Sequence, residues 1–266
     1  MTNVDSPSPI VVGVDGSMAA IRAAEWAIDE ATSRGLTLRL VHVAAFDELL
    51  LTGTEQTVLE SPLRGAASAV AATGKPVKVD TAVIRGAVLL TLADESRRAA
   101  MMCVGSVGIG RVARTLLGST AAALVTKAHC PVAIIRSESD APPEGGGWIA
   151  VAVDDKSDAV LYYAMEEGRL RKAPVLAVAA RWHSPAGTAA QTLKQRIDSW
   201  IRRYPDVVVR LVDAYAGALQ YVEHHDLNVQ LAVVSPADAD FVMRLVGPHG
   251  HPILAHADCS VLVVRP

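Results

Sequence analysis

The sequence is poor in aromatic residues, which make up 4% of its 266 residues although 51% are hydrophobic. Any core must therefore consist mainly of Val, Leu, Ile and Ala, a composition that favours a buried parallel sheet under alanine-rich helices. Long apolar runs are also missing: no segment approaches the roughly 18 residues of a membrane-spanning helix, and the N-terminal residues do not read as a secretion signal. We expect a cytoplasmic protein with no membrane partner.

The sequence also has few cysteines and only a small net charge. The three cysteines, Cys103, Cys130 and Cys259, lie far apart in the sequence and none is part of a CxxC pair. This spacing predicts buried reduced thiols rather than a disulfide framework or a zinc site. The formal net charge of −3 gives the chain no overall attraction for a polyanion, so nucleic acid is not expected as a partner.

Length and the spacing of apolar runs predict the domain organisation. A chain of 266 residues is long for one domain and natural for two. In the first half, apolar runs alternate with amphipathic segments, which predicts parallel strands joined by helices. The expected elements are strands at 10–14, 36–43, 77–84, 101–104 and 132–135 and helices at 18–34, 58–73, 88–98 and from 119 onward.

The second half repeats this pattern after a break. Residues 138–147 are rich in Pro, Gly and acidic residues and indicate a linker. Residues 149–154 then echo residues 10–15, and the ending Cys259 to Arg265 echoes Cys130 to Arg136. The repeat predicts two tandem domains, residues 1–137 and 148–266, joined by the linker.

A glycine-rich stretch follows the apolar run at 101–104. Gly105 and Gly108 are placed to bring backbone N–H groups close to an anion, because no Cβ intervenes. Gly118, Ser119 and Thr120 open a helix, whose first N–H groups and positive dipole end favour phosphate. The alternative is that these glycines only turn a surface loop. The stretch lacks the lysine of a P-loop and does not follow the first strand, as a dinucleotide fingerprint would.

Several motifs together resemble the universal stress protein family. They are Gly105-x2-Gly108-x9-Gly118-Ser119, the sequence His129-Cys130-Pro131-Val132, and the opening Val11-Val12-Gly13-Val14-Asp15-Gly16-Ser17. The resemblance covers the whole chain as a tandem pair. It implies two flavodoxin-like α/β domains, similar to adenine nucleotide alpha hydrolases. Each would hold a five-stranded parallel sheet of order 3-2-1-4-5 with helices on both faces.

The resemblance also implies a ligand. ATP or a related adenine nucleotide, with Mg²⁺ as a further candidate, would bind beyond strands 1 and 4 of the N-terminal domain. Asp15 would face the ribose or the metal-phosphate region, and Val41 would meet the adenine through its backbone. The phosphates would be held by Gly105, Gly108, Gly118, Ser119 and Thr120. ATP-binding members usually carry Ser or Thr two residues after Ser119, where this chain has Ala121.

The second copy departs from the phosphate motif. Alignment of the repeats places Asp238 against Gly108 and Pro248 against Ser119, which brings negative charge and removes a backbone donor. The C-terminal site is therefore expected to be degenerate, and the glycines at 105, 108 and 118 are interpreted as a demand of the ligand rather than of the fold. The histidine-rich loop 249–256 leaves two alternatives open, a metal site or a polar loop beside a vestigial pocket.

The sequence shows no constellation for efficient catalysis. Ser119 and His129 would lie almost three turns apart on one helix, and no general base is evident. No catalytic residue and no metal ligand are therefore assigned. We expect a regulatory stress-response protein with an unidentified protein partner, and a homodimer. The alternatives are a nucleotide-independent interaction module with two degenerate pockets, favoured by Ala121, and a slow ATPase.

Overall fold

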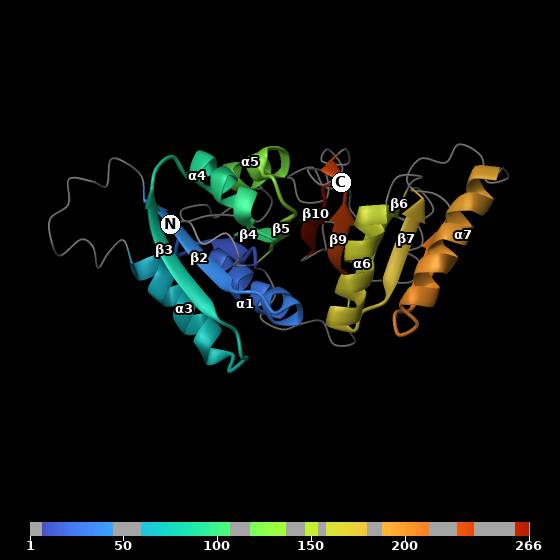
Figure 1. Ribbon diagram of the computed structural model, residues 1–266, viewed down its shortest axis with the longest axis horizontal. Coiled ribbons are helices and arrows are strands. Elements are labelled where there is room, and N and C mark those ends of the chain that lie inside the picture. Colours follow the sequence, from blue (N-terminus) through green and yellow to red (C-terminus); the bar gives the residue numbers. More distant parts are fainter. Residues whose placement is uncertain are drawn as a thin grey trace, which may run out of the picture. The chain divides into compact units, whose positions relative to one another are not determined.

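The computed structural model describes residues 7–44, 60–106, 118–136, 147–153, 158–179, 188–212, 228–236 and 259–265. The chain divides into two compact units, residues 1–137 and 138–266. Figure 1 shows that each unit consists of strands and helices that follow one another along the chain. We describe each unit by itself.

The first unit has a five-stranded parallel sheet in the order β3-β2-β1-β4-β5, as predicted. Helices α1 and α3 pack against each other, as do α4 and α5, and Figure 1 shows the two pairs on opposite faces of the sheet. The elements are β1 (Ile10–Gly13), α1 (Met18–Arg34), β2 (Leu38–Ala44), α3 (Ser61–Ala72), β3 (Val79–Arg85), α4 (Val88–Glu95), the short 3₁₀ turn η2 (Ser96–Arg98), β4 (Met101–Gly105), α5 (Ser119–Lys127) and β5 (Val132–Ile135).

The second unit repeats this topology, with the order β8-β7-β6-β9-β10. Its elements are β6 (Trp148–Val153), α6 (Asp158–Arg171), β7 (Val175–Ala179), α7 (Thr188–Arg203), β8 (Val209–Val212), β9 (Val229–Val234) and β10 (Ser260–Val263). Read in chain order, both sheets have the strand order 3-2-1-4-5. The predicted fold class of both units is therefore confirmed.

The two sheets also share their register. In the first unit Ile10 lies opposite Leu38 and Met101. In the second unit Ile149 lies opposite Val175 and Leu231. The pairing therefore gives a residue-by-residue correspondence between the units, which the site analysis below uses.

Helix α1 shows why these residues form this layer. Ser17 caps its N-terminus by accepting from the N–H of Ala20 (3.1 Å), and Gly35 ends it with a φ of 63°, in the left-handed region that glycine adopts without strain. Small side chains let the helix lie close to the sheet. The buried alanines of α1 are Ala19, Ala20, Ala23, Ala24, Ala27 and Ala31.

The C-terminal ends of α1 and α6 carry the same buried ion pair. Glu30 is fully buried and pairs with Arg34 at 2.9 Å, while Glu167 is fully buried and pairs with Arg171 at 2.7 Å. Lys172, with a φ of 51°, follows α6 as Gly35 follows α1. The repeat thus extends to the chemistry of the helix ends, which the sequence analysis did not predict.

The predicted helix at 88–98 is shorter than expected. Helix α4 ends at Glu95 and continues as η2, whose first residue Ser96 donates its hydroxyl to the carbonyl of Ala93 (2.6 Å). The same hydroxyl accepts the backbone N–H of His129 at 2.8 Å. Ser96 therefore connects the end of α4 to the turn that leads into β5, and the backbone of His129 takes part in this connection.

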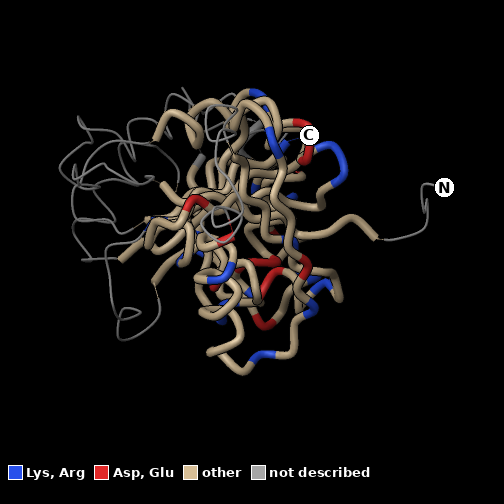
Figure 2. Tube along the Cα trace, turned by 90° about the vertical axis from the view of Figure 1, so that its left-hand side faces the viewer, with Lys and Arg blue, Asp and Glu red and all other residues tan. Residues whose placement is uncertain are grey.

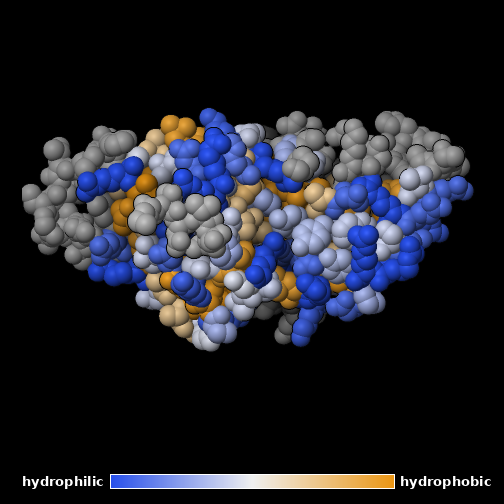
Figure 3. Space-filling view, viewed as in Figure 1, coloured by the Kyte–Doolittle hydropathy of each residue, from blue (hydrophilic) through white to orange (hydrophobic). Residues whose placement is uncertain are grey.

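The described surface is mixed in polarity. Figure 2 shows basic and acidic residues close to one another along the trace, and Arg39 of β2 binds both Glu95 (3.1 Å) and Asp80. In Figure 3 hydrophobic areas alternate with hydrophilic ones on the visible face. Within the described ranges, no helix is both long and apolar enough to cross a membrane.

A cluster of aromatic and charged side chains joins α6 to α7. Asp158 accepts from the side chain of Arg196 at 2.7 Å, and Trp200 stacks on Tyr204 with ring centroids 6.1 Å apart. The hydroxyl of Tyr204 donates to Glu166 at 2.6 Å. Burial, and then the bond to Glu166, raise the pKa of Tyr204 well above its ordinary value.

This shift predicts a loss of stability at alkaline pH. A tyrosine in the unfolded chain ionises near pH 10, by the reference value of about 10, while Tyr204 in the folded unit keeps its proton. The contribution of protonated Tyr204 to the free energy of unfolding is therefore complete below that pH and declines as pH rises above it. Urea unfolding followed at several pH values should show that Tyr204→Phe is less stable than the wild type near pH 8 and loses less stability above pH 10. An equal loss above pH 10 in both proteins would contradict the assignment to Tyr204.

Candidate functional site

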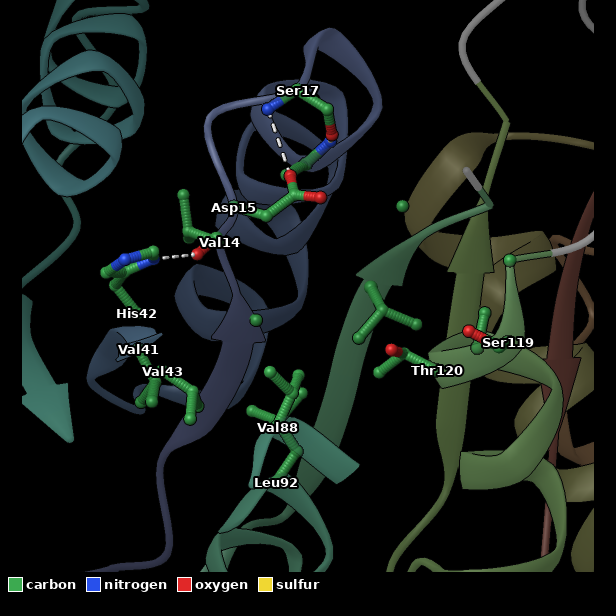
Figure 4. A pocket seen from close by; sticks show the side chains of 16 residues that line it. Val14, Asp15, Ser17, Val41, His42, Val43, Val88, Leu92, Ser119 and Thr120 are labelled. Carbon is green, nitrogen blue, oxygen red and sulfur yellow. Dashed lines mark hydrogen bonds between the residues drawn. The ribbon is translucent and has the colours of Figure 1, made fainter. Parts of the chain in front are cut away.

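A pocket of about 300 Å³ lies at the carboxyl ends of β1, β2 and β4 in the first unit. Figure 4 shows it from close by, with side chains from several strands, helices and loops around it. Its lining consists of Gly13, Val14, Asp15, Ser17, Ala20, Val41, His42, Val43, Val88, Leu92, Val104, Gly105, Gly118, Ser119, Thr120 and Ala121. Ligands of parallel α/β proteins bind at this edge of the sheet.

One side of the pocket is apolar. Val41 and Val43 come from β2, and Val88 and Leu92 come from α4. Alternation along the strand puts the two β2 valines on one face, and the i, i+4 spacing does the same on the helix. Figure 4 shows these four side chains gathered together, away from Ser119 and Thr120. This wall can cover the face of a planar, apolar or aromatic group.

The other side is the N-terminus of α5. Gly118 is its N-cap, with φ −61° and ψ 146°, a conformation open to any residue. The N–H of Gly118 donates to the carbonyl of Ser106 at 2.7 Å. Because Gly118 has no side chain, it offers no acceptor to the first-turn N–H groups of Ser119, Thr120 and Ala121. These N–H groups and the helix dipole favour an anion here.

The loop between β1 and α1 carries the acidic group of the pocket. Asp15 accepts the backbone N–H of Ser17 through Oδ1 at 2.9 Å. Gly16, between them, has a φ of 86°, in the region where only glycine is free of strain. The carboxylate is thus oriented by its own loop, at the same pocket as the α5 N-terminus (Figure 4).

Gly105 has a role that the sequence analysis did not expect. A Cβ on Gly105 would lie 2.6 Å from the carbonyl carbon of Ala19 and 2.8 Å from the nitrogen of Ala20, both in the backbone of α1. Contacts this short do not occur, so the packing of α1 in this unit requires glycine at 105. The interpretation that only a ligand requires this glycine is therefore wrong.

The structure brings most of the predicted site residues to one pocket. Asp15, Val41, Gly105, Gly118, Ser119 and Thr120 all line it, while Gly108 lies outside the described residues. Ala121, which stands where ATP-binding family members usually have Ser or Thr, is 2% exposed and lines the pocket with a methyl group that cannot donate. Asp238, Pro248 and the loop 249–256 also lie outside the described residues.

Among the lining residues that sequence reasoning did not assign to the site are Val43, Val88, Leu92 and His42. Val43 could have been found from Val41 by the two-residue period of a strand, and Val88 and Leu92 by their helical spacing. His42 is the one polar residue of the run 40–44, and a polar residue in such a run indicates a specific contact. In the described part of the chain, no three His, Cys, Asp or Glu side chains are grouped as metal ligands, so Asp15 is the carboxylate that this pocket offers a cation.

Comparison with known proteins finds relatives that match this chain over almost all of their length and of its own. Residues 8–136 match the model of the universal stress protein family. A universal stress protein of Mycobacterium tuberculosis is 46% identical over 260 residues, which cover 96% of each chain, and another from this species is 36% identical over 275 residues, 99% of this chain and 98% of the other. The crystal structure of a universal stress protein from Archaeoglobus fulgidus has a TM-score of 0.67 at 16% identity, over 97% of this chain and 96% of that one.

The close approach at Gly105 predicts the effect of a single methyl group. Gly105→Ala should lower the free energy of unfolding by about 1–3 kcal/mol without any ligand, because the backbone of α1 has to move. Gly65→Ala is the matched control, since a Cβ there meets no atom within 4 Å and alanine favours a helix by about 1 kcal/mol. Urea unfolding measures both. A Gly105→Ala variant as stable as the wild type would show that the helix does not require this glycine.

Proposed function

Because the chain belongs to the universal stress protein family, we propose that its N-terminal unit binds ATP or a related adenine nucleotide. The observation that carries this proposal is the composition of one pocket, with an apolar wall on one side and a helix N-terminus on the other. An adenine nucleotide has the matching parts, a planar base and an anionic phosphate chain. The output we propose is regulation or sensing in a stress response, and not efficient turnover.

The apolar wall suits the base. Val41, Val43 and Leu92 are buried, and Val88, which is 40% exposed, also lines the pocket. The carbonyl of Val41 already accepts the N–H of Val14 at 2.8 Å, so one of its lone pairs is engaged within the protein. In our proposal the isopropyl group of Val41 therefore contributes to base binding in addition to its backbone.

The N-terminus of α5 suits the phosphates. The N–H groups and the hydroxyls of Ser119 and Thr120 would donate to phosphate oxygens, and Asp15 would hold either a ribose hydroxyl or a Mg²⁺ ion. Asp15 is one carboxylate, so a Mg²⁺ ion there would complete its coordination with phosphate oxygens and water. The pocket volume of about 300 Å³ lies at the lower end of the range for small-molecule sites.

Regulation would follow from ordering of the pocket. A bound phosphate chain would connect α5 to the loop that carries Asp15, and so fix the surface that a second copy of the chain or a protein partner contacts. The pocket offers one carboxylate and two hydroxyls, which is too little for efficient phosphoryl transfer. We therefore propose that any ATP hydrolysis is slow.

The binding proposal is tested at Gly118. The backbone at this residue accepts aspartate without strain, and aspartate is a good N-cap, so Gly118→Asp should remain folded. Its carboxylate would occupy the first-turn N–H groups and repel phosphate, which should weaken ATP-Mg binding at least about a hundredfold. Titration calorimetry measures the affinity, and Gly118→Asn is the control that caps the helix without charge. Equal ATP affinity in wild type and Gly118→Asp would contradict a phosphate site at α5.

Turnover is tested with the same pair of proteins. We expect wild-type protein to form ADP from ATP only slowly, so that most of an excess of ATP remains after hours with Mg²⁺ present. Rapid consumption of excess ATP by the wild type, lost in Gly118→Asp, would contradict the regulatory proposal and favour an enzymatic function.

A nucleotide-independent interaction module is the second candidate, and Ala121 favours it. The methyl group of Ala121 stands at the third position of α5 and removes a possible hydroxyl donor from the pocket. Acid release of small molecules from freshly purified protein, followed by mass spectrometry, separates the two. An adenine compound supports nucleotide binding. Its absence, together with no heat on titration with ATP-Mg up to millimolar concentration, supports the interaction module.

A further inference from the structure

His42 contacts the loop that carries Asp15. Its Nδ1 lies 2.8 Å from the carbonyl oxygen of Val14, the residue before Asp15 (Figure 4). A carbonyl oxygen can only accept a hydrogen bond, so Nδ1 must carry the hydrogen and donate it. The contact therefore fixes the neutral ring as the tautomer with its N–H at Nδ1.

Val14 is held by two consecutive residues of β2. Its N–H donates to the carbonyl of Val41 at 2.8 Å, and its carbonyl accepts from His42. Because the peptide unit is planar, holding the carbonyl of Val14 also fixes the direction of the N–H of Asp15. On the other side, Ser17 donates to the carboxylate of Asp15. The backbone and the side chain of Asp15 are thus restrained from both ends of the loop.

The second unit shows that the fold does not require this histidine. By the shared register, Ala179 of β7 corresponds to His42, and Val153 corresponds to Val14. In the second unit the strands pair one residue further, through Val153 and Ala179. In the first unit β1 ends at Gly13, and a side chain takes over the next carbonyl. The histidine thus occurs in the unit whose sequence keeps the phosphate-compatible glycines.

We propose that His42 is a positioning residue of the nucleotide pocket. Its Nδ1–H holds the peptide between Val14 and Asp15 so that the carboxylate of Asp15 is presented to the ligand before the ligand binds. This inference rests on the proposed function. His42 itself contributes through Asp15, so its loss weakens binding by allowing the loop to adopt other conformations.

The test compares three substitutions of one residue in the full chain. Asn places an amide N–H where His42 has Nδ1, whereas Gln reaches further and places its amide near Nε2, and Ala matches the second unit. Calorimetry with ATP-Mg should show about tenfold weaker binding for His42→Ala and His42→Gln. His42→Asn should bind within about threefold of the wild type. His129→Ala is the control, because only the backbone of this exposed histidine binds Ser96.

Two results of the affinity measurements would overturn the inference. One is equal affinity of His42→Ala and the wild type, and the other is His42→Asn as weak as His42→Ala although thermal unfolding shows both folded. Imidazole ¹⁵N NMR of the protein without nucleotide should show the Nδ1–H tautomer for His42, and the other tautomer would also overturn it. If the wild type does not bind ATP, the proposed function fails and this inference fails with it. If the wild type binds ATP and the His42 variants bind it equally well, only the inference is overturned.

Discussion

The site depends on the divergence of two chain connections at neighbouring strand ends. β1 and β4 pair in parallel, so both end at the same edge of the sheet. The chain leaving β1 enters α1 on one face, and the chain leaving β4 leads to α5 on the other (Figure 1). A crevice opens where adjacent strands send their helices to opposite faces. Asp15 on one connection and Gly118 on the other both line the pocket that fills this crevice.

Helix α1 approaches β4 closely beside this crevice. The backbone of α1 lies so near Gly105 that no side chain fits between them. The second unit keeps the register but has Ser235 at the corresponding position, and a serine Cβ excludes an approach of 2.6 Å. The close approach is therefore a property of the first unit and not of the topology.

Much of the fold could be predicted because its signals are local. Helix α1 begins and ends at the predicted residues, since Ser17 caps it and Gly35 stops it, and both act within one turn. Phosphate-compatible residues at 118–120 could also be predicted, because a helix N-terminus has a local signature. The reason for Gly105 could not, since its neighbours in α1 lie far away in the sequence. The contact of His42 was missed for the same reason, because Val14 is 28 residues away.

Comparison of the two units also separates residues of the fold from residues of the site. A fully buried glutamate such as Glu30 would ordinarily be a candidate for acid–base chemistry. Glu167 recurs at the equivalent place, fully buried and with the same arginine spacing, in the unit whose sequence has lost the phosphate motif. Because both units share this glutamate–arginine pair, we interpret it as a stabilising feature of the helix end and not as evidence of acid–base chemistry. The comparison gives the opposite result for His42, because the second unit has alanine at the corresponding position and its strand pairing extends to Val153 and Ala179. A difference between the repeats therefore points to the ligand only where helix packing does not account for it, as it does at Gly105 and does not at His42.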